Sequence, residues 1–232
     1  MKKPEQLFPP GLIVSCQALE HEPLHGPEIM AKMAVAAKMG GAIGIRANTP
    51  PDIRAISSAT DLPIIGIYKK VYEGFDVFIT PTFAAARAVA EAGCAMIALD
   101  ATPRPRPEDE DLAEIIRRIH NELDLPVMAD CSTAEEAIRA AELGADVVSS
   151  TLSGYTLYSP KSAEPDFAMI SRMLERVDAP VFAEGHFHYP EQVTRALKMG
   201  CHAVVVGGAI TRPQEITRRF VEMIKITQKD KS

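Results

Sequence analysis

The sequence contains no tryptophan, and aromatic residues make up only 6% of its 232 positions. Its four cysteines, Cys16, Cys94, Cys131 and Cys201, lie far apart and form no CxxC pair. This spacing indicates neither a disulfide framework nor a zinc knuckle. We therefore expect a protein of a reducing compartment, and the cytoplasm fits this best.

An excess of positive charge and long hydrophobic runs are also missing. The 25 Lys and Arg residues against 31 Asp and Glu residues give a net charge of −6, the wrong sign for a surface that follows a phosphate backbone. No apolar run reaches the roughly 18 residues of a membrane-spanning helix, and no apolar stretch follows the two N-terminal lysines. We expect neither a nucleic-acid partner, nor a membrane partner, nor an export signal.

Two kinds of junction alternate along the chain. In the first, a helix-like run ends in glycine and a short apolar run follows, because glycine supplies the left-handed backbone that ends a helix. In the second, proline introduces the apolar run, which it can do at the first residue of a strand. The glycines are Gly40, Gly93, Gly144 and Gly200, and the prolines are Pro10, Pro63, Pro126 and Pro180.

These junctions predict eight short strands separated by helices. The strands are expected at 12–15, 42–45, 64–67, 95–99, 127–129, 146–149, 181–183 and 203–206. Strands that are apolar throughout and alternate with helices favour a parallel sheet covered on its outside. We predict a (β/α)8 TIM barrel that spans 1–232 as a single domain, with a lead-in at 1–10 and a frayed tail at 225–232. An open doubly wound sheet is the alternative.

Local signals mark several helix starts. Ser132 followed by Glu135 has the spacing of a capping box. Thr49 precedes Pro50 as an N-cap precedes proline at the first helical position, and Pro190 opens a later helix.

Polar or glycine residues follow every predicted strand. The C-terminal ends of the strands carry the active site of a TIM barrel, so this ring of residues predicts an active site. The residues are Gln17, Arg46, Lys69, Asp100, Asp130, Ser149-Ser150-Thr151, Glu184 and Gly207-Gly208, in strand order.

The last two strand ends have the layout of a phosphate site. Gly185 and the pair Gly207-Gly208 place backbone N–H groups, free of side chains, where many barrels hold a phosphate. Arg212 follows and can add a fixed positive charge. The alternative is an ordinary tight turn with a solvated arginine. We expect a small phosphorylated substrate.

Lys69 and Glu184 follow the third and seventh strands, on opposite sides of a closed barrel. A desolvated lysine loses proton affinity and can act as a base or a Schiff-base nucleophile, and a nearby carboxylate can move a proton. The alternatives are a surface lysine beside Lys70 and a structural ion pair. His186 and His188 alternate in a loop without a third ligand at suitable spacing, so we expect no metal.

A series of motifs from about residue 11 to residue 222 resembles the N-acetylmannosamine-6-phosphate 2-epimerase family. The motifs are the segment 31–48, PIIGIYK at 63–69, VFITPT at 77–82, IALDAT at 97–102 with RPRP at 104–107, MAD at 128–130, SGYT at 153–156, AEG at 183–185 and VGGAITRP at 206–213. They occur in order and without large gaps, and their combination is specific where each alone is not.

The resemblance implies a cytoplasmic, homodimeric TIM barrel of sialic acid and amino-sugar catabolism. Such an enzyme interconverts N-acetylmannosamine 6-phosphate and N-acetylglucosamine 6-phosphate without a cofactor. By motif, the family's catalytic lysine and glutamate fall on Lys69 and Glu184. One departure is visible: His186-Phe187-His188-Tyr189 stands where the family pattern has a basic residue and a shorter polar run.

The same resemblance implies that Gln17, Arg46 and Asp130 belong to the sugar pocket. Epimerisation removes the C2 proton of the open-chain sugar, passes through an enolate and returns a proton to the opposite face. Lys69 would exchange that proton, while Glu184 would assist ring opening or carry a proton through a hydroxyl.

Three other functions remain possible on the same residues. A Schiff-base aldolase would form a borohydride-trappable adduct on Lys69. A metal-dependent pentose-phosphate epimerase would be inhibited by chelators, and a regulator built on an inactive barrel would bind a sugar phosphate without turnover.

Overall fold

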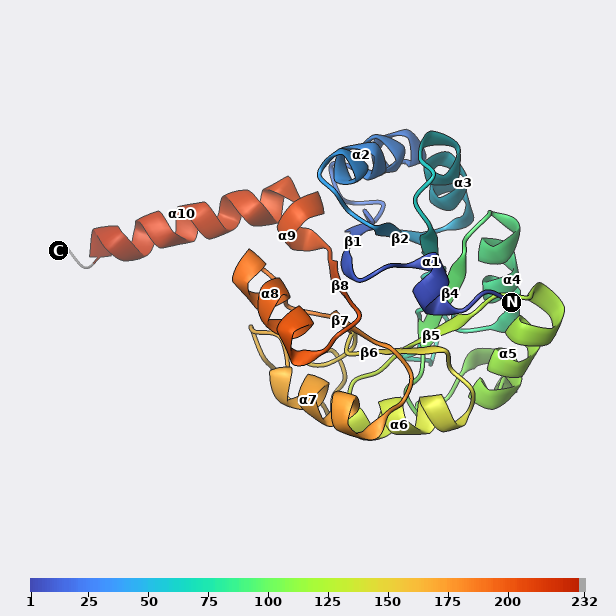
Figure 1. The fold of residues 1–232 in the computed structure, drawn as a ribbon. Helices are drawn as coiled ribbons and strands as arrows, with labels where there is room; N and C mark the ends of the chain where they lie inside the picture. The colour runs from blue at the N-terminus through green and yellow to red at the C-terminus, as the bar shows by residue number, and fades with distance from the viewer. Residues whose placement is uncertain (230–232) are drawn as a thin grey trace.

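The computed structural model describes the backbone of residues 1–229 and the side chains of residues 1–226. Eight parallel strands form a closed barrel in sequence order, because β8 pairs with β1 as well as with β7 (Figure 1). The strands are β1 Gly11–Cys16, β2 Gly44–Asn48, β3 Ile64–Ile67, β4 Met96–Asp100, β5 Val127–Asp130, β6 Val147–Ser149, β7 Val181–Glu184 and β8 Ala203–Val206. The predicted TIM barrel is confirmed, and the open-sheet alternative is wrong.

Helices follow the strands around the barrel. They are α1 Pro4–Leu7, α2 Pro27–Met39, α3 Pro50–Ala59, α4 Phe83–Glu91, α5 Leu112–Arg118, α6 Ala134–Glu142, α7 Phe167–Arg176, α8 Pro190–Met199, α9 Gly208–Thr211 and α10 Pro213–Lys229. A short turn of helix at Pro107–Asp109 precedes α5, and a π-helical segment at Ile119–Leu123 follows it. Helix α10 includes residues 225–229 of the expected frayed tail, and residues 230–232 lie outside the described residues.

The helix-start signals are correct at Thr49 and Pro190, and one residue early at Ser132. Thr49 caps α3 by accepting a hydrogen bond from the Asp52 amide at 3.4 Å. The capping box at α6 uses Thr133, whose extended backbone lets its Oγ1 accept from the amide of Glu136 at 3.2 Å. Ser132 instead donates through its own amide and hydroxyl to the Glu136 carboxylate, at 2.6 and 2.9 Å.

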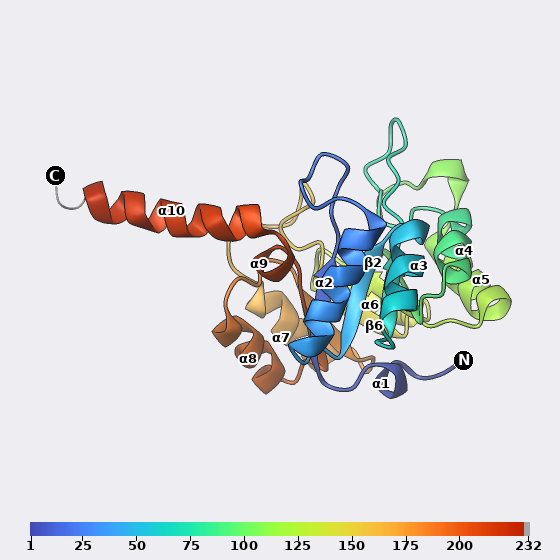
Figure 2. The ribbon, with the colours of Figure 1, turned by 90° about the horizontal axis from the view of Figure 1, so that it is seen from above.

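The interior of the barrel is filled from its N-terminal end. Phe8, which follows α1, is fully buried and meets the ring of Phe182 edge to face, with ring centroids 6.1 Å apart. Buried side chains of the strands, among them Ile65 and Met128, complete this inner cluster. Helix α1 lies at the end of the barrel opposite the loops that follow β1 and β3 (Figure 2). Space for a ligand is therefore found at the C-terminal ends of the strands.

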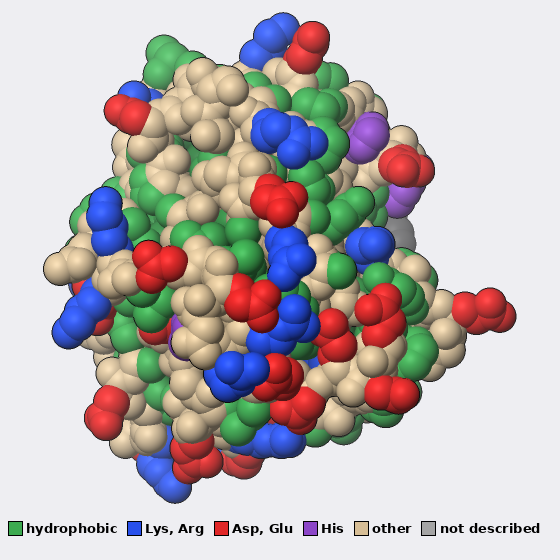
Figure 3. Space-filling view, turned by 90° about the vertical axis from the view of Figure 1, so that its right-hand side faces the viewer, with side chains coloured by type: hydrophobic (Ala, Val, Ile, Leu, Met, Phe, Trp, Pro, Cys, Tyr) green, Lys and Arg blue, Asp and Glu red, His purple; other side chains and the backbone are tan. Residues whose placement is uncertain are grey.

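Helix α10 extends away from the barrel and contacts α9 at its start (Figures 1 and 2). It occupies the chain position of the eighth covering helix of a (β/α)8 barrel, yet the side chains of Phe220, Val221, Ile224 and Ile226 are exposed. In contrast to the exposed apolar side chains of α10, the face that carries α4 and α5 has acidic and basic side chains interspersed over it (Figure 3). Among residues 1–229, no helix has the length and apolar character needed to cross a membrane.

Candidate active site

A cavity of about 410 Å³ opens at the C-terminal ends of the strands. Seven of the nine predicted site residues line it: Gln17, Lys69, Glu184, Gly185, Gly207, Gly208 and Arg212. They come from the ends of β1, β3, β7 and β8, so closure of the barrel brings together segments that are far apart in sequence.

The other two predicted residues, Arg46 and Asp130, are buried beside the cavity rather than lining it. Their side chains are 1% and 0% exposed. Arg46 donates from Nη2 and Nη1 to the two carboxylate oxygens of Asp130 at 2.5 and 3.0 Å. Its Nη1 also donates to Oε2 of Glu184 at 2.8 Å. One guanidinium from β2 therefore holds carboxylates from β5 and β7 together.

Thr151 completes this cluster, and the sequence analysis gave it no role. Its hydroxyl lies 2.7 Å from Oδ1 of Asp130 and 3.1 Å from Oε2 of Glu184. The hydroxyl of Ser149 lies 2.8 Å from it on the other side. The polar run at the end of the sixth strand was the available signal, but only the fold shows that it faces two carboxylates.

Glu184 carries a carboxyl group whose pKa is raised to about 7. Burial is the largest cause, and it outweighs the opposing effect of the Arg46 guanidinium on the pKa. The backbone is fixed by Ser150, whose hydroxyl accepts from the Glu184 amide at 3.1 Å and donates to the Glu184 carbonyl at 2.8 Å. The carboxyl group is thus held in place and can gain or lose a proton near neutral pH.

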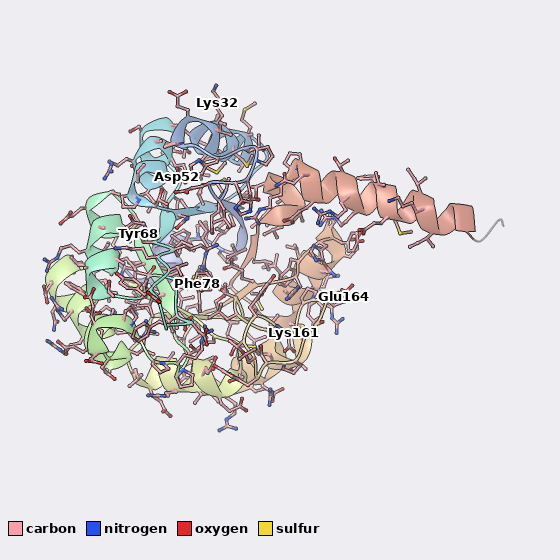
Figure 4. All side chains as sticks on the ribbon, turned by 180° about the vertical axis from the view of Figure 1, so that it is seen from behind. Lys32, Asp52, Tyr68, Phe78, Lys161 and Glu164 are labelled. Carbon is pink, nitrogen blue, oxygen red and sulfur yellow. The ribbon has the colours of Figure 1, made fainter. Side chains whose placement is uncertain are left out.

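Lys69 lies at the start of the long loop between β3 and α4. Its amide donates to Oδ1 of Asn48 at 2.9 Å, and the loop folds back so that Lys69 bridges to Ile79. Tyr68 and Phe78, which stand at the two ends of this loop, are labelled in Figure 4. Phe78 also lines the cavity. The backbone of Lys69 is therefore held by β2 and by the returning loop.

The pKa of Lys69 is lowered to about 8. Burial is the largest cause, the cations of Arg46 and Arg212 act in the same direction, and the carboxylates of Glu184 and Asp130 oppose it. Within the described residues the Lys69 ammonium forms no ion pair. A neutral amine is therefore accessible at mildly alkaline pH.

Gln17 projects into the cavity from the end of β1. Its Nε2 donates to the Ser15 hydroxyl at 2.8 Å. Its Oε1 is buried and has no hydrogen-bond partner among the described residues. A buried acceptor without a partner is costly, so this oxygen is available to a hydroxyl or amide group of a ligand.

The predicted phosphate residues surround one corner of the cavity. Gly207 and Gly208 form the turn into α9, and the Thr211 hydroxyl lies 3.1 Å from the Gly207 carbonyl and 3.0 Å from the Ser15 carbonyl of β1. Arg212 follows immediately, and its Nε and Nη2 donate to the carboxylate of Glu22 at 2.6 and 3.2 Å. The arginine is thus oriented by an acidic residue of the β1–α2 loop that the sequence analysis did not identify.

The loop after β7 places His186 at the cavity, where the family pattern has a basic residue. His186 has a left-handed backbone, with φ of 60°, and its ring stacks on Tyr155 at a centroid distance of 4.8 Å. Its Nε2 lies 3.2 Å from the carbonyl of Ser153. His188 also lines the cavity, but its Nδ1 lies 3.1 Å from Nη1 of Arg219. The two histidines therefore do not converge on one point.

Two further sequence inferences concern metals and cysteines. Within the part of the chain that the structure describes, no three His, Cys, Asp or Glu side chains are grouped so that they could hold a metal ion. Cys16 and Cys131 are buried, and burial raises the pKa of the Cys16 thiol to about 12. Such a thiol packs as a small apolar side chain and is a poor nucleophile at neutral pH.

Comparison with known proteins agrees with this architecture. Residues 30–226 match the model of a family described as "Putative N-acetylmannosamine-6-phosphate epimerase". The chain belongs to this family. A family member from Caldanaerobacter subterraneus, named as the 2-epimerase, is 53% identical over 93% of this chain and 91% of its own. One from Listeria monocytogenes serotype 4a is 50% identical over 95% of this chain and 94% of its own.

Among solved structures, one at high sequence identity supports the family, and one at low identity supports the fold alone. The N-acetylmannosamine-6-phosphate 2-epimerase from Clostridium perfringens superposes with a TM-score of 0.92 and 47% identity, over 94% of this chain and 95% of that chain. A thiamine phosphate pyrophosphorylase from Pyrococcus furiosus, at 18% identity and a TM-score of 0.58 over 95% of this chain and 96% of that chain, shares the fold alone.

The Arg46 cluster generates a prediction about stability. Replacing Arg46 with Met leaves the carboxylates of Asp130 and Glu184 buried without their counter-charge, which costs about 3–5 kcal/mol when one partner of a buried pair is removed. We expect R46M to lower the free energy of unfolding, measured in urea, by that amount. R117M is the control, because Arg117 forms a solvent-exposed pair with Glu114, and such pairs contribute little to stability. An R46M protein as stable as R117M would contradict the prediction.

Proposed function

We propose that this protein interconverts N-acetylmannosamine 6-phosphate and N-acetylglucosamine 6-phosphate by proton exchange at C2. The observation that carries the proposal is the cavity that holds Lys69 and Glu184, two proton-carrying groups whose pKa values lie near 8 and 7. A general acid or base works best when its pKa is close to the working pH. Membership of the epimerase family supports the choice of substrate.

The chemistry follows from the acidity of the hydrogen at C2. In the open-chain sugar this carbon lies next to the C1 aldehyde, so its proton can be removed to leave an enolate. Neutral Lys69 takes the proton and becomes an ammonium, which also stabilises the enolate oxygen electrostatically. Return of a proton to the opposite face of C2 completes the inversion.

Glu184 comes from the strand opposite Lys69 in the barrel. A carboxyl group with a pKa near 7 can both donate and accept a proton at neutral pH, so it suits ring opening and proton delivery to the second face of C2. Arg46, Asp130 and Thr151 fix its orientation. We therefore assign Arg46 and Asp130 to positioning Glu184, and Gln17, through its unpaired Oε1, to a polar group of the sugar.

The phosphate group of the substrate would lie at the corner formed by Gly185, Gly207, Gly208 and Arg212. Backbone N–H groups at a glycine turn and a guanidinium provide a site for an anion at this position of a barrel. The binding energy of the phosphate would hold C2 in place between Lys69 and Glu184. We place the reaction in the cytoplasm and in the catabolism of amino sugars such as sialic acid.

A proton NMR time course tests the function directly. N-acetylmannosamine 6-phosphate in deuterated buffer with EDTA should give N-acetylglucosamine 6-phosphate with loss of the C2 proton signal. K69A should lower the rate by about 10²–10⁴-fold, the range for a positioned acid or base. K70A is the matched control, because Lys70 is the exposed neighbour. The E184Q variant separates the two roles of Glu184. If it still exchanges the C2 proton with solvent but does not invert C2, Glu184 delivers the second proton. If it loses both exchange and inversion, Glu184 acts in ring opening.

The outcomes that would contradict the proposal are specific. An unchanged spectrum from folded protein, both with and without EDTA, would exclude the epimerase and favour the aldolase or the inactive binding barrel. Loss of activity caused by EDTA would indicate the metal-dependent reaction, and a borohydride-stable adduct on Lys69 would indicate the aldolase.

The pKa of Lys69 predicts how activity depends on pH. The amine must be neutral to accept the C2 proton, and below its pKa of about 8 it is mostly protonated. We expect kcat/KM, which reports the free enzyme, to rise with pH from 6 as Lys69 becomes neutral and to fall above pH 8, where Glu184 has lost the proton that it delivers. A profile that is flat between pH 6 and 8 would contradict the role of Lys69 as base.

We also propose that the protein is a homodimer in which α10 contributes to the interface. The exposed side chains of Phe220, Val221, Ile224 and Ile226 all belong to one terminal helix, and exposed apolar side chains gathered on one element favour an interaction site. Light scattering should give twice the 25.2 kDa mass of one chain. F220D should shift the mass towards the monomer, whereas E222K, on the same helix, should not. A monomeric wild-type protein would contradict the proposal.

A further inference from the structure

Two carboxylates flank Arg212, and they are held in different ways. The carboxylate of Glu22 is 11% exposed and accepts both Nε and Nη2 of Arg212. It also accepts from Nε2 of Gln214 at 3.1 Å and from the amide of Leu19 at 2.7 Å. Glu215 begins α10, its side chain is 40% exposed, and its Oε1 lies 3.7 Å from Nε of Arg212. Glu22 is therefore tightly fixed, and Glu215 is loosely held.

The carboxylate of Glu215 covers Gly208. A Cβ atom built on Gly208 would collide with Oε2 of Glu215, so this oxygen lies directly against the turn. Nη1 of Arg212 is on the same side, 3.6 Å from that Cβ position. Glu215 also lines the cavity. An anionic oxygen of the protein thus occupies the corner where Gly208 and Arg212 meet.

The charges at this corner are unfavourable for a second anion. The guanidinium of Arg212 contributes one positive charge, and the carboxylates of Glu22 and Glu215 contribute two negative charges. A phosphate monoester adds about −1.5 to −2 near neutral pH, by analogy with a phosphorylated side chain. Glu215 also fills the space on the Cβ side of Gly208, so a phosphate that uses this space competes with that carboxylate.

We propose that Glu215 is a built-in competitor for the phosphate group of the substrate. Its carboxylate lies over Gly208, at the position proposed for the phosphate, and swings into solvent when the substrate binds. Glu22 stays in place, because four donors hold it, and it keeps Nη1 of Arg212 directed towards the turn. This inference rests on the proposed function, which places the phosphate at Gly207, Gly208 and Arg212.

Inorganic phosphate is the probe, and its dissociation constant is measured by calorimetry. E215Q removes the negative charge and should tighten phosphate binding by about two- to five-fold, the range for partly exposed charge interactions. The gain should shrink at high salt, because the interaction is screened. E222Q removes the same charge from an exposed position on α10 and is the matched control, for which no gain is expected. The KM for the sugar phosphate should fall in E215Q by the same factor.

The contradicting outcomes separate the two proposals. If R212M weakens phosphate binding and E215Q leaves it unchanged or weaker, the phosphate position stands and the competitor is excluded. If the wild-type protein binds no phosphate and R212M leaves the KM unchanged, the phosphate position itself is wrong. If E222Q gains as much as E215Q, the effect is one of overall charge, and the competitor is also excluded.

Discussion

The buried guanidinium of Arg46 is the interaction on which the rest of the site depends. It is almost fully buried and holds carboxylates from two other strands. Taking these charges out of water costs several kcal/mol per ion, and the cost is offset only if each keeps its partner and its geometry. The cluster therefore permits little movement of β2, β5 and β7 relative to one another. Glu184, at the edge of this cluster, is held by Arg46, which does not line the cavity, and by Thr151, which does.

The same burial sets the proton affinity of both candidate catalytic groups. Desolvation disfavours the charged form of either group, so it raises the pKa of Glu184 and lowers that of Lys69. Arg46 acts against the first shift and adds to the second. The pKa values, which differ by six units in the unperturbed side chains, come within about one unit of each other. The barrel is packed with apolar side chains at the N-terminal ends of its strands and lined by polar groups at their C-terminal ends. Lys69 and Glu184, at the polar end, can therefore exchange protons near neutral pH.

Sequence patterns predicted the barrel because each strand has its own local signal, a preceding glycine or proline and an apolar run. They located Lys69 and Glu184 because these residues end strands. They could not show that Arg46 and Asp130, 84 positions apart, pair with each other beside the cavity. Nor could they show that α10 projects, since an amphipathic helix has the same periodicity whether it covers its own barrel or another surface. Contacts between loops, such as that of Glu22 with Arg212, carry no periodic signal.

Arg212 also links the phosphate corner to Lys69. Arg212 is one of the cations that lower the pKa of Lys69, so the net charge at the phosphate corner influences the base. His186, whose ring stacks on Tyr155, stands where the family pattern has a basic residue. If Glu215 leaves when phosphate binds, one negative charge replaces another, and the corner changes by about one charge instead of two. The exchange would therefore limit how far substrate binding raises the pKa of Lys69, and the amine would stay able to accept the C2 proton.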